Sequence, residues 1–198
     1  MWEQVLAWGA VGLIAIAATG VLLARDWRWS LGLVAAQYLA ASILTTAHWP
    51  VGMAASLLVA GWMSVAALGM TLTSLPPRIP ATESSWPQAR AFRLFMAGMV
   101  YVLAAGLTPR IGAFLPGISS PVIAGSILLM GVGLLLLGTN AQVVPITLGL
   151  FTVLMGFEVF YSAVEGSILV AGMLAAVNLG LALAGAFLSN SDMPEETA

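Results

Sequence analysis

Pro121-Val-Ile-Ala-Gly-Ser-Ile-Leu-Leu-Met-Gly-Val-Gly-Leu-Leu-Leu-Leu-Gly138 is an unbroken apolar segment without a charged side chain. A helix that crosses the hydrocarbon core of a bilayer needs about 20 mostly apolar residues. This segment meets that requirement. It predicts a transmembrane helix within a series that extends along the chain on both sides.

Six further segments of the same kind flank it. They cover residues 5–24, 30–47, 51–72, 91–107, 143–163 and 168–188. Arg93 falls in the first turn of the fourth of the seven segments, but a long arginine side chain can reach the membrane surface from there. We therefore count seven spans and predict an all-α fold, a polytopic transmembrane bundle of about seven helices.

The composition of the chain excludes several classes of protein. Of its 198 residues, 61% are hydrophobic and 7% are charged, whereas soluble domains carry roughly 25% charged residues. The net charge of −2 gives no sign of nucleic-acid binding. The absence of Cys and Lys and the single His exclude disulfides, iron–sulfur clusters, a retinal Schiff base and a bis-histidine haem. We expect no cofactor.

Polar segments divide the chain into three parts. A proline-rich loop near residues 76–90 lies within the first part, residues 1–120, which holds about four spans. Residues 121–188 form a three-helix unit, and an acidic tail follows at 189–198. Pro109 and Pro116 predict a turn over residues 108–120.

The arginines predict the orientation of the bundle. Cytoplasmic loops of membrane proteins carry an excess of positive charge. With seven spans, five of the six arginines fall on one side, and only Arg110 falls on the other. The N-terminus is therefore expected outside and the C-terminus in the cytoplasm. The five are Arg25, Arg28, Arg78, Arg90 and Arg93.

Glu158 is the most informative residue, because it lies inside the sixth apolar segment. A carboxylate in hydrocarbon costs several kcal/mol, and such residues mark proton or ion paths or pair with another group. A carboxyl that can hold or release a proton is what a proton relay needs. The alternative is a protonated glutamate that only hydrogen-bonds a neighbouring helix.

Four other polar residues are candidates for the same path. Tyr161 is three residues after Glu158, within hydrogen-bonding reach, and Glu165 is two turns further on at the outer surface. Asn178 is near the middle of the seventh segment, where it can face Glu158, and Gln37 is next to Tyr38 in the second. Polar residues at such positions commonly hold two helices together, and we favour that role for Asn178 and Gln37.

The last three segments carry a recognisable pattern. The polar turn Thr139-Asn-Ala-Gln142 leads to Leu154-Met-Gly-Phe-Glu158-Val-Phe-Tyr-Ser-Ala163, followed by the small-residue segment Leu174-Ala-Ala-Val-Asn-Leu-Gly-Leu-Ala-Leu183. This pattern resembles the K subunit of respiratory complex I and the related C subunit of multisubunit cation/proton antiporters. With its additional N-terminal helices, the chain is similar to component E of the membrane-bound group-four hydrogenases.

The resemblance implies a role. In K-like subunits, intramembrane glutamates help to form the axis along which protons move, and Glu158 matches one of them. The second glutamate of the family falls near residues 176–178, where this chain has no acid. The resemblance thus implies a non-catalytic membrane subunit of a complex-I-like or hydrogenase-like proton-translocating assembly in a prokaryotic inner membrane. Its partners would be the lipid bilayer and other membrane subunits, antiporter-like ones among them.

Two alternatives remain open at this point. The chain can be a purely structural membrane subunit of a respiratory or photosynthetic complex, which the missing second acid favours. It can also be a small stand-alone transporter. Against that reading, the segments offer few polar residues for a substrate site and show no inverted repeat.

Overall fold

The computed structural model describes residues 2–24, 26–75 and 87–191, with side chains from residue 90 onward in the last range. Over these ranges the chain forms seven helices and no strand, as predicted. The helices are α1 (Trp2–Leu23), α2 (Trp27–Thr45), α3 (Val51–Ser74), α4 (Pro87–Phe114), α5 (Ser120–Thr139), α6 (Val143–Val164) and α7 (Ile168–Ser191). Most of the predicted proline-rich loop and of the acidic tail, with Arg25 and Arg78, lie outside the described residues.

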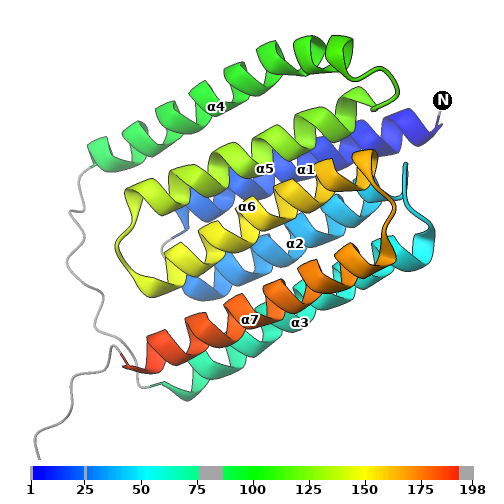
Figure 1. Cartoon of the computed structure of the whole chain (residues 1–198). Helices are drawn as coiled ribbons and strands as arrows, with labels where there is room; N and C mark the ends of the chain where they lie inside the picture. Colours follow the sequence, from blue (N-terminus) through cyan, green and yellow to red (C-terminus); the bar gives the residue numbers. More distant parts are fainter. Residues whose placement is uncertain (1, 25, 76–86, 192–198) are drawn as a thin grey trace, which may run out of the picture.

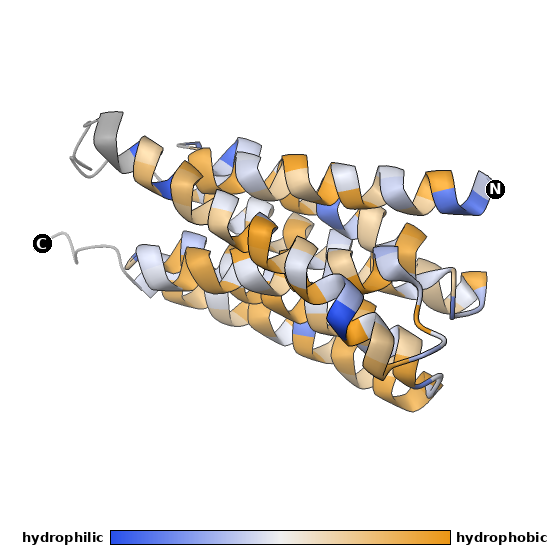
Figure 2. Cartoon of the chain, turned by 90° about the horizontal axis from the view of Figure 1, so that it is seen from above, coloured by the Kyte–Doolittle hydropathy of each residue, from blue (hydrophilic) through white to orange (hydrophobic). Residues whose placement is uncertain are grey.

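The helices lie in two layers (Figure 1). One layer contains α1, α2 and α3, and the other contains α4, α5, α6 and α7, side by side in that order. Across the layers, α1 packs against α4 and α5, α2 against α5 and α6, and α3 against α7. Consecutive helices run in opposite directions, so α1 begins at one end of the bundle and α7 ends at the other (Figure 2).

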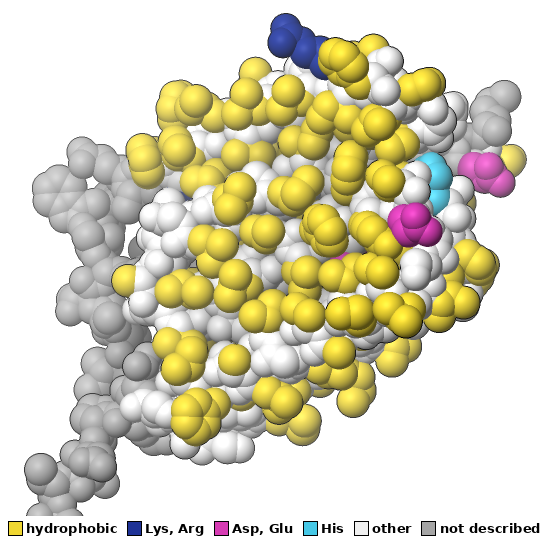
Figure 3. Space-filling model, in the orientation of Figure 1, with side chains coloured by type: hydrophobic (Ala, Val, Ile, Leu, Met, Phe, Trp, Pro, Cys, Tyr) yellow, Lys and Arg dark blue, Asp and Glu magenta, His cyan; other side chains and the backbone are white. Residues whose placement is uncertain are grey.

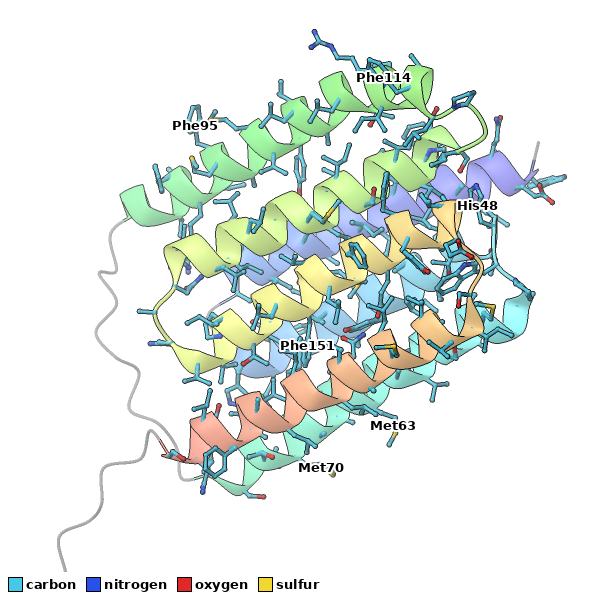
Figure 4. The ribbon with its side chains drawn as sticks, in the orientation of Figure 1. His48, Met63, Met70, Phe95, Phe114 and Phe151 are labelled. Atoms are coloured by element: carbon cyan, nitrogen blue, oxygen red, sulfur yellow. The ribbon has the colours of Figure 1, made fainter. Side chains whose placement is uncertain are left out.

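The outer surface of the bundle is apolar. Hydrophobic side chains cover most of the face drawn in Figure 3, and the acidic side chains and the single His lie toward one end of it. Met63 and Met70 project outward from α3, and Phe95 and Phe114 project outward from α4, whereas Phe151 is fully buried in the bundle (Figure 4). Such a surface suits contact with lipid chains.

Six of the seven helices are long and apolar enough to cross a membrane, and the exception is α2. The sequence pointed instead to the fourth segment, with Arg93, as the doubtful one. The structure gives α4 an apolar stretch from Arg90 to Phe114 that qualifies. By contrast, α2 carries Arg28 near its start and buries Gln37 and Tyr38 against its neighbours. Its contacts with α1, α3, α5 and α6 explain how so polar a helix is accommodated.

The predicted turn over residues 108–120 is wrong in its first half, because α4 continues through Pro109 to Phe114. Pro109 has no amide hydrogen to donate to the carbonyl of Ala105, four residues earlier, so the helix continues with one backbone hydrogen bond fewer. The adjacent carbonyl of Ala104 accepts a hydrogen bond from the hydroxyl of Thr108 at 2.6 Å. The chain turns only beyond this point, where Gly117 has a φ of 118° that favours glycine.

Glycine allows α5 and α6 to approach closely. A β-carbon at Gly133 would lie 2.7 Å from the backbone nitrogen of Val153, and one at Gly156 would lie 2.8 Å from that of Met130. Small residues at such contacts let helix backbones pack tightly in membranes. This packing fixes α6 on one side and leaves its opposite face to α2 and α7, where Glu158 lies.

Candidate functional site

Three buried polar side chains from three helices form a continuous hydrogen-bonded chain. The hydroxyl of Tyr38 in α2 donates to Oδ1 of Asn178 in α7 at 2.7 Å. Nδ2 of Asn178 in turn donates to Oε1 of Glu158 in α6 at 3.0 Å. The exposed fractions are 0% for Tyr38, 1% for Asn178 and 2% for Glu158. We call these three residues the carboxyl network.

The helical repeat explains why these residues point inward. Glu158 shares the buried face of α6 with Met155, three residues before it, and Ser162, four residues after it. Asn178 begins the buried face of α7, which continues with Ala182, Gly185 and Ser189. Glu158 and Asn178 therefore lie at positions on the faces of α6 and α7 that pack against neighbouring helices.

The carboxyl network lies nearer one end of the bundle. Glu158 comes six residues before the last residue of α6, about 9 Å along the axis. This end carries the turn between α2 and α3 and the turn between α6 and α7. Nε1 of the buried Trp49, in the first turn, donates to the carbonyl of Glu165, in the second, at 2.9 Å. We refer to this end as the Trp49 end.

Glu158 has unused hydrogen-bonding capacity. Oε2 is buried and has no hydrogen-bond partner among the described residues. The amide of Asn178, a neutral group, is the donor to the other oxygen. Oε2 is therefore the carboxyl oxygen at which a proton can be gained or lost without breaking a bond of the network.

A small cavity reaches the carboxyl network from the Trp49 end. Its volume is about 10 Å³, and it is lined by Glu158, Asn178, Trp49 and residues of α3 and α7. A cavity needs roughly 10–15 Å³ by this measure to hold one water molecule. The arrangement can therefore hydrate a buried carboxyl but offers no room there for a larger ligand.

Gln37 belongs to a second polar contact. Its Oε1 accepts a hydrogen bond from the hydroxyl of Thr152 in α6 at 3.3 Å, and that hydroxyl also lies 2.8 Å from the carbonyl of Leu148. Nε2 of Gln37 is buried and has no hydrogen-bond partner in the described part of the chain. Gln37 thus adjoins the carboxyl network through its neighbour Tyr38 in sequence, without a bond to Glu158.

The structure separates the other two candidates from the carboxyl. Tyr161 is half-buried and stacks on the exposed ring of Phe157, with ring centroids 6.0 Å apart. Ser162, equally close in sequence, donates to the carbonyl of Val159. Glu165 is exposed at the Trp49 end. Neither Tyr161 nor Glu165 hydrogen-bonds Glu158 within the ranges that the structure describes.

Sequence reasoning left two contributors out of the site. Tyr38 was noted only as the neighbour of Gln37, and Thr152 was not singled out. Both are polar residues inside apolar segments, which is the signal that identified Asn178. What the sequence lacks is the arrangement in space of α2, α6 and α7, which makes Thr152 a partner of Gln37 and Tyr38 a partner of Asn178.

Comparison with protein-family models, with curated proteins and with solved structures gives no significant match to this chain. The fold and the site therefore define its class by themselves. The chain is an integral membrane protein, an all-helical bundle with a hydrogen-bonded carboxyl in its interior. The resemblance of residues 121–188 to K-like subunits stays a prediction.

Proposed function

We propose that the chain is a non-catalytic membrane subunit of a complex-I-like or hydrogenase-like proton-translocating assembly. In this proposal it lies in a prokaryotic inner membrane and contributes Glu158 to a proton path. The observation that carries the proposal is the carboxyl network, in which a 2% exposed glutamate is held by Asn178 and, through it, by Tyr38. A buried intramembrane carboxyl is costly, and a function is the usual reason for keeping one.

The residues of the network have different roles in this proposal. Glu158 carries the proton, because a carboxyl takes up and releases protons and an amide does not. Asn178 positions the carboxyl by donating to Oε1 while it accepts from Tyr38. The two contacts hold Oε2 in place for proton exchange.

Buried polar side chains at several levels of α6 support a path rather than an isolated group. Thr152 is six residues before Glu158, about 9 Å along the helix. Further buried polar side chains follow toward both ends of the helix, so polar groups recur through the thickness of the bundle. The buried polar residues of α6 are Thr147, Thr152, Glu158 and Ser162.

The outer face of α7 supports docking of a partner subunit, antiporter-like in this proposal. Four exposed small residues follow one another at intervals of four residues along it. A β-carbon at Gly172 or Gly180 would meet nothing within 4 Å. Transmembrane helices pack closely against such rows. The row consists of Gly172, Ala176, Gly180 and Ala184.

The test is Glu158→Gln in the native membrane assembly. Glutamine keeps the size of the side chain and an oxygen that can accept from Asn178, but it cannot release a proton. We expect the assembly to form in normal amounts and proton pumping per assembled complex to fall. Glu3→Gln, which removes an exposed acid from α1, is the matched control. Unchanged pumping in Glu158→Gln would refute the proposal.

A second candidate function is a purely structural subunit. It is favoured by the way Asn178 joins three helices, since such a contact stabilises the bundle whether or not protons move. On this reading Glu158→Gln lowers the amount of assembled complex and leaves pumping per complex unchanged. A stand-alone transporter is less well supported, because the cavity at Glu158 has room for about one water molecule.

A further inference from the structure

The cavity at Glu158 lies between α3 and α7. Small side chains line it from both helices: Ser56 and Ala60 from α3, Ala171 and Ala175 from α7. Ser56 is exposed at the outer side of the cavity, whereas Glu158 is buried at its inner side. The cavity therefore connects the surface of the bundle with the carboxyl.

The polar groups of the cavity suit one water molecule. A bound water needs two to four polar partners. Oε2 of Glu158 is buried without a partner in the described structure. The hydroxyl of Ser56 donates to the carbonyl of Met53 at 2.7 Å, and its oxygen can still accept a hydrogen bond. One water can therefore donate to the Ser56 oxygen and hydrogen-bond Oε2, as the acceptor when the carboxyl is protonated and as the donor when it is a carboxylate.

Trp49 closes the cavity at the Trp49 end. It is 4% exposed, and its indole nitrogen is bound to the carbonyl of Glu165. The ring therefore holds the turn before α3 against the turn before α7. Trp49 and the small side chains beside it therefore lie between the cavity and the aqueous phase at this end.

We propose that this cavity is a water-binding site through which Glu158 exchanges protons with the aqueous phase at the Trp49 end. The water enters between α3 and α7 beneath Trp49. In the exchange, the O–H bond of the carboxyl breaks and its proton forms a bond to the bound water. That water passes a proton to the next water, and Glu158 is left as a carboxylate. The reverse sequence reprotonates it.

The inference rests on the proposed function, and it adds a specific role for α3. This helix lies outside the three-helix unit of residues 121–188, and it forms one wall of the access route. The competing route would reach Glu158 along the Gln37–Thr152 contact on the α2 side. The two routes can be told apart by the positions at which a bulky side chain slows the exchange.

The experiment measures hydrogen–deuterium exchange of the Glu158 carboxyl by infrared spectroscopy. The purified full chain in lipid nanodiscs is kept below pH 4.3, the ordinary pKa of a glutamate, so that the carboxyl is protonated. The C=O stretching band is assigned by difference from Glu158→Gln. The buffer is then changed from H2O to D2O, and the shift of the band is followed in time.

Ala175→Leu is the blocking variant and Ala176→Leu is its control. Ala175 lines the cavity, whereas its neighbour Ala176 is exposed on the outer face of α7. We expect Ala175→Leu to slow the exchange by about tenfold or more, since exchange then depends on local opening of the bundle. Ala60→Leu, with the exposed Ala55→Leu as control, tests the α3 wall independently should Ala175→Leu fail to fold.

Equal exchange rates in the blocking variants and their controls would overturn the access route. Slowing by Thr152→Leu instead would place the route on the α2 side and overturn it too. Because the exchange is measured on the isolated chain and does not depend on pumping, this outcome is separate from the proposed function. If Ala175→Leu exchanges as fast as its control while Glu158→Gln loses pumping, the access route is wrong and the proposed function stands. If Ala175→Leu exchanges slowly while Glu158→Gln pumps normally, the water site stands and the proposed proton path is wrong.

Discussion

Gly61 of α3 lies against the aromatic ring of Tyr38 of α2, so closely that a β-carbon at residue 61 would be 2.2 Å from Cδ1 of the tyrosine. Tyr38 is fully buried, and its hydroxyl reaches Asn178 across the bundle. The missing side chain of Gly61 therefore makes room for the ring that completes the carboxyl network. A fourth helix thereby takes part in positioning Glu158.

Gly61→Ala is expected to lower the free energy of unfolding by about 1–3 kcal/mol, the usual cost of overpacking a core. The tyrosine ring must move, and the bond from Tyr38 to Asn178 is lost with it. Unfolding in mixed micelles at increasing denaturant measures the change. Gly52→Ala on the same helix is the control, because a β-carbon there meets nothing within 4 Å. Equal stability of the two variants would contradict the close contact.

Asn178→Leu is expected to destabilise the bundle by about 1–3 kcal/mol, because it leaves the buried hydroxyl of Tyr38 and the carboxyl of Glu158 without their partner. The same unfolding assay measures it. Val177→Leu, at the neighbouring lipid-facing position, should change the stability little. If Asn178→Leu is as stable as the unmodified chain, the amide does not hold the network together.

Tyr101→Phe is expected to loosen α4. The hydroxyl of Tyr101 lies 2.7 Å from the carbonyl of Ala15 and also contacts the hydroxyl of Thr19, both in α1. Because α4 packs only against α1 and α5 within the described structure, this bond is a large part of its polar attachment. Backbone hydrogen exchange should accelerate in peptides of α4 and stay unchanged in α6. Tyr161→Phe, whose hydroxyl makes no hydrogen bond in the described structure, should leave both unchanged.

The orientation predicted from the arginines is tested with single cysteines. The chain contains none, so each introduced thiol is the sole target for labelling. Ala47→Cys lies at the Trp49 end and Asn190→Cys at the opposite end, and both residues are exposed. In intact cells a membrane-impermeant maleimide should label residue 47, and residue 190 only after lysis. The reverse pattern would show that the N-terminus is cytoplasmic.

The helices were predictable because their main determinant is local. An apolar segment of sufficient length forms a spanning helix wherever it occurs, and the predicted segment 143–163 corresponds to α6, Val143–Val164. The error at Pro109 has the same origin. Proline is a breaker by local rules, but the apolar segment on either side of Pro109 continues as one helix to Phe114.

The site was predictable in part. Glu158 and Asn178 stood out because a polar group in an apolar segment needs a partner. Helical spacing places both Tyr161 and Ser162 within reach of Glu158. It does not decide the direction of a half-buried ring, and in the structure Tyr161 stacks on Phe157. The roles of Tyr38, Thr152 and Gly61 depend on contacts between different helices, which residue spacing within one helix does not encode.

The central place of α2 has a consequence for how the protein is made. It is the one described helix that is not apolar enough over a sufficient length to cross a membrane by itself, and its buried Gln37 and Tyr38 need protein neighbours. The helices synthesised just before and just after it, α1 and α3, both pack against it. The hydrogen-bond partners of Gln37 and Tyr38, however, lie in α6 and α7. We therefore expect α2 to become stable in the membrane only after the last two helices of the bundle have been made.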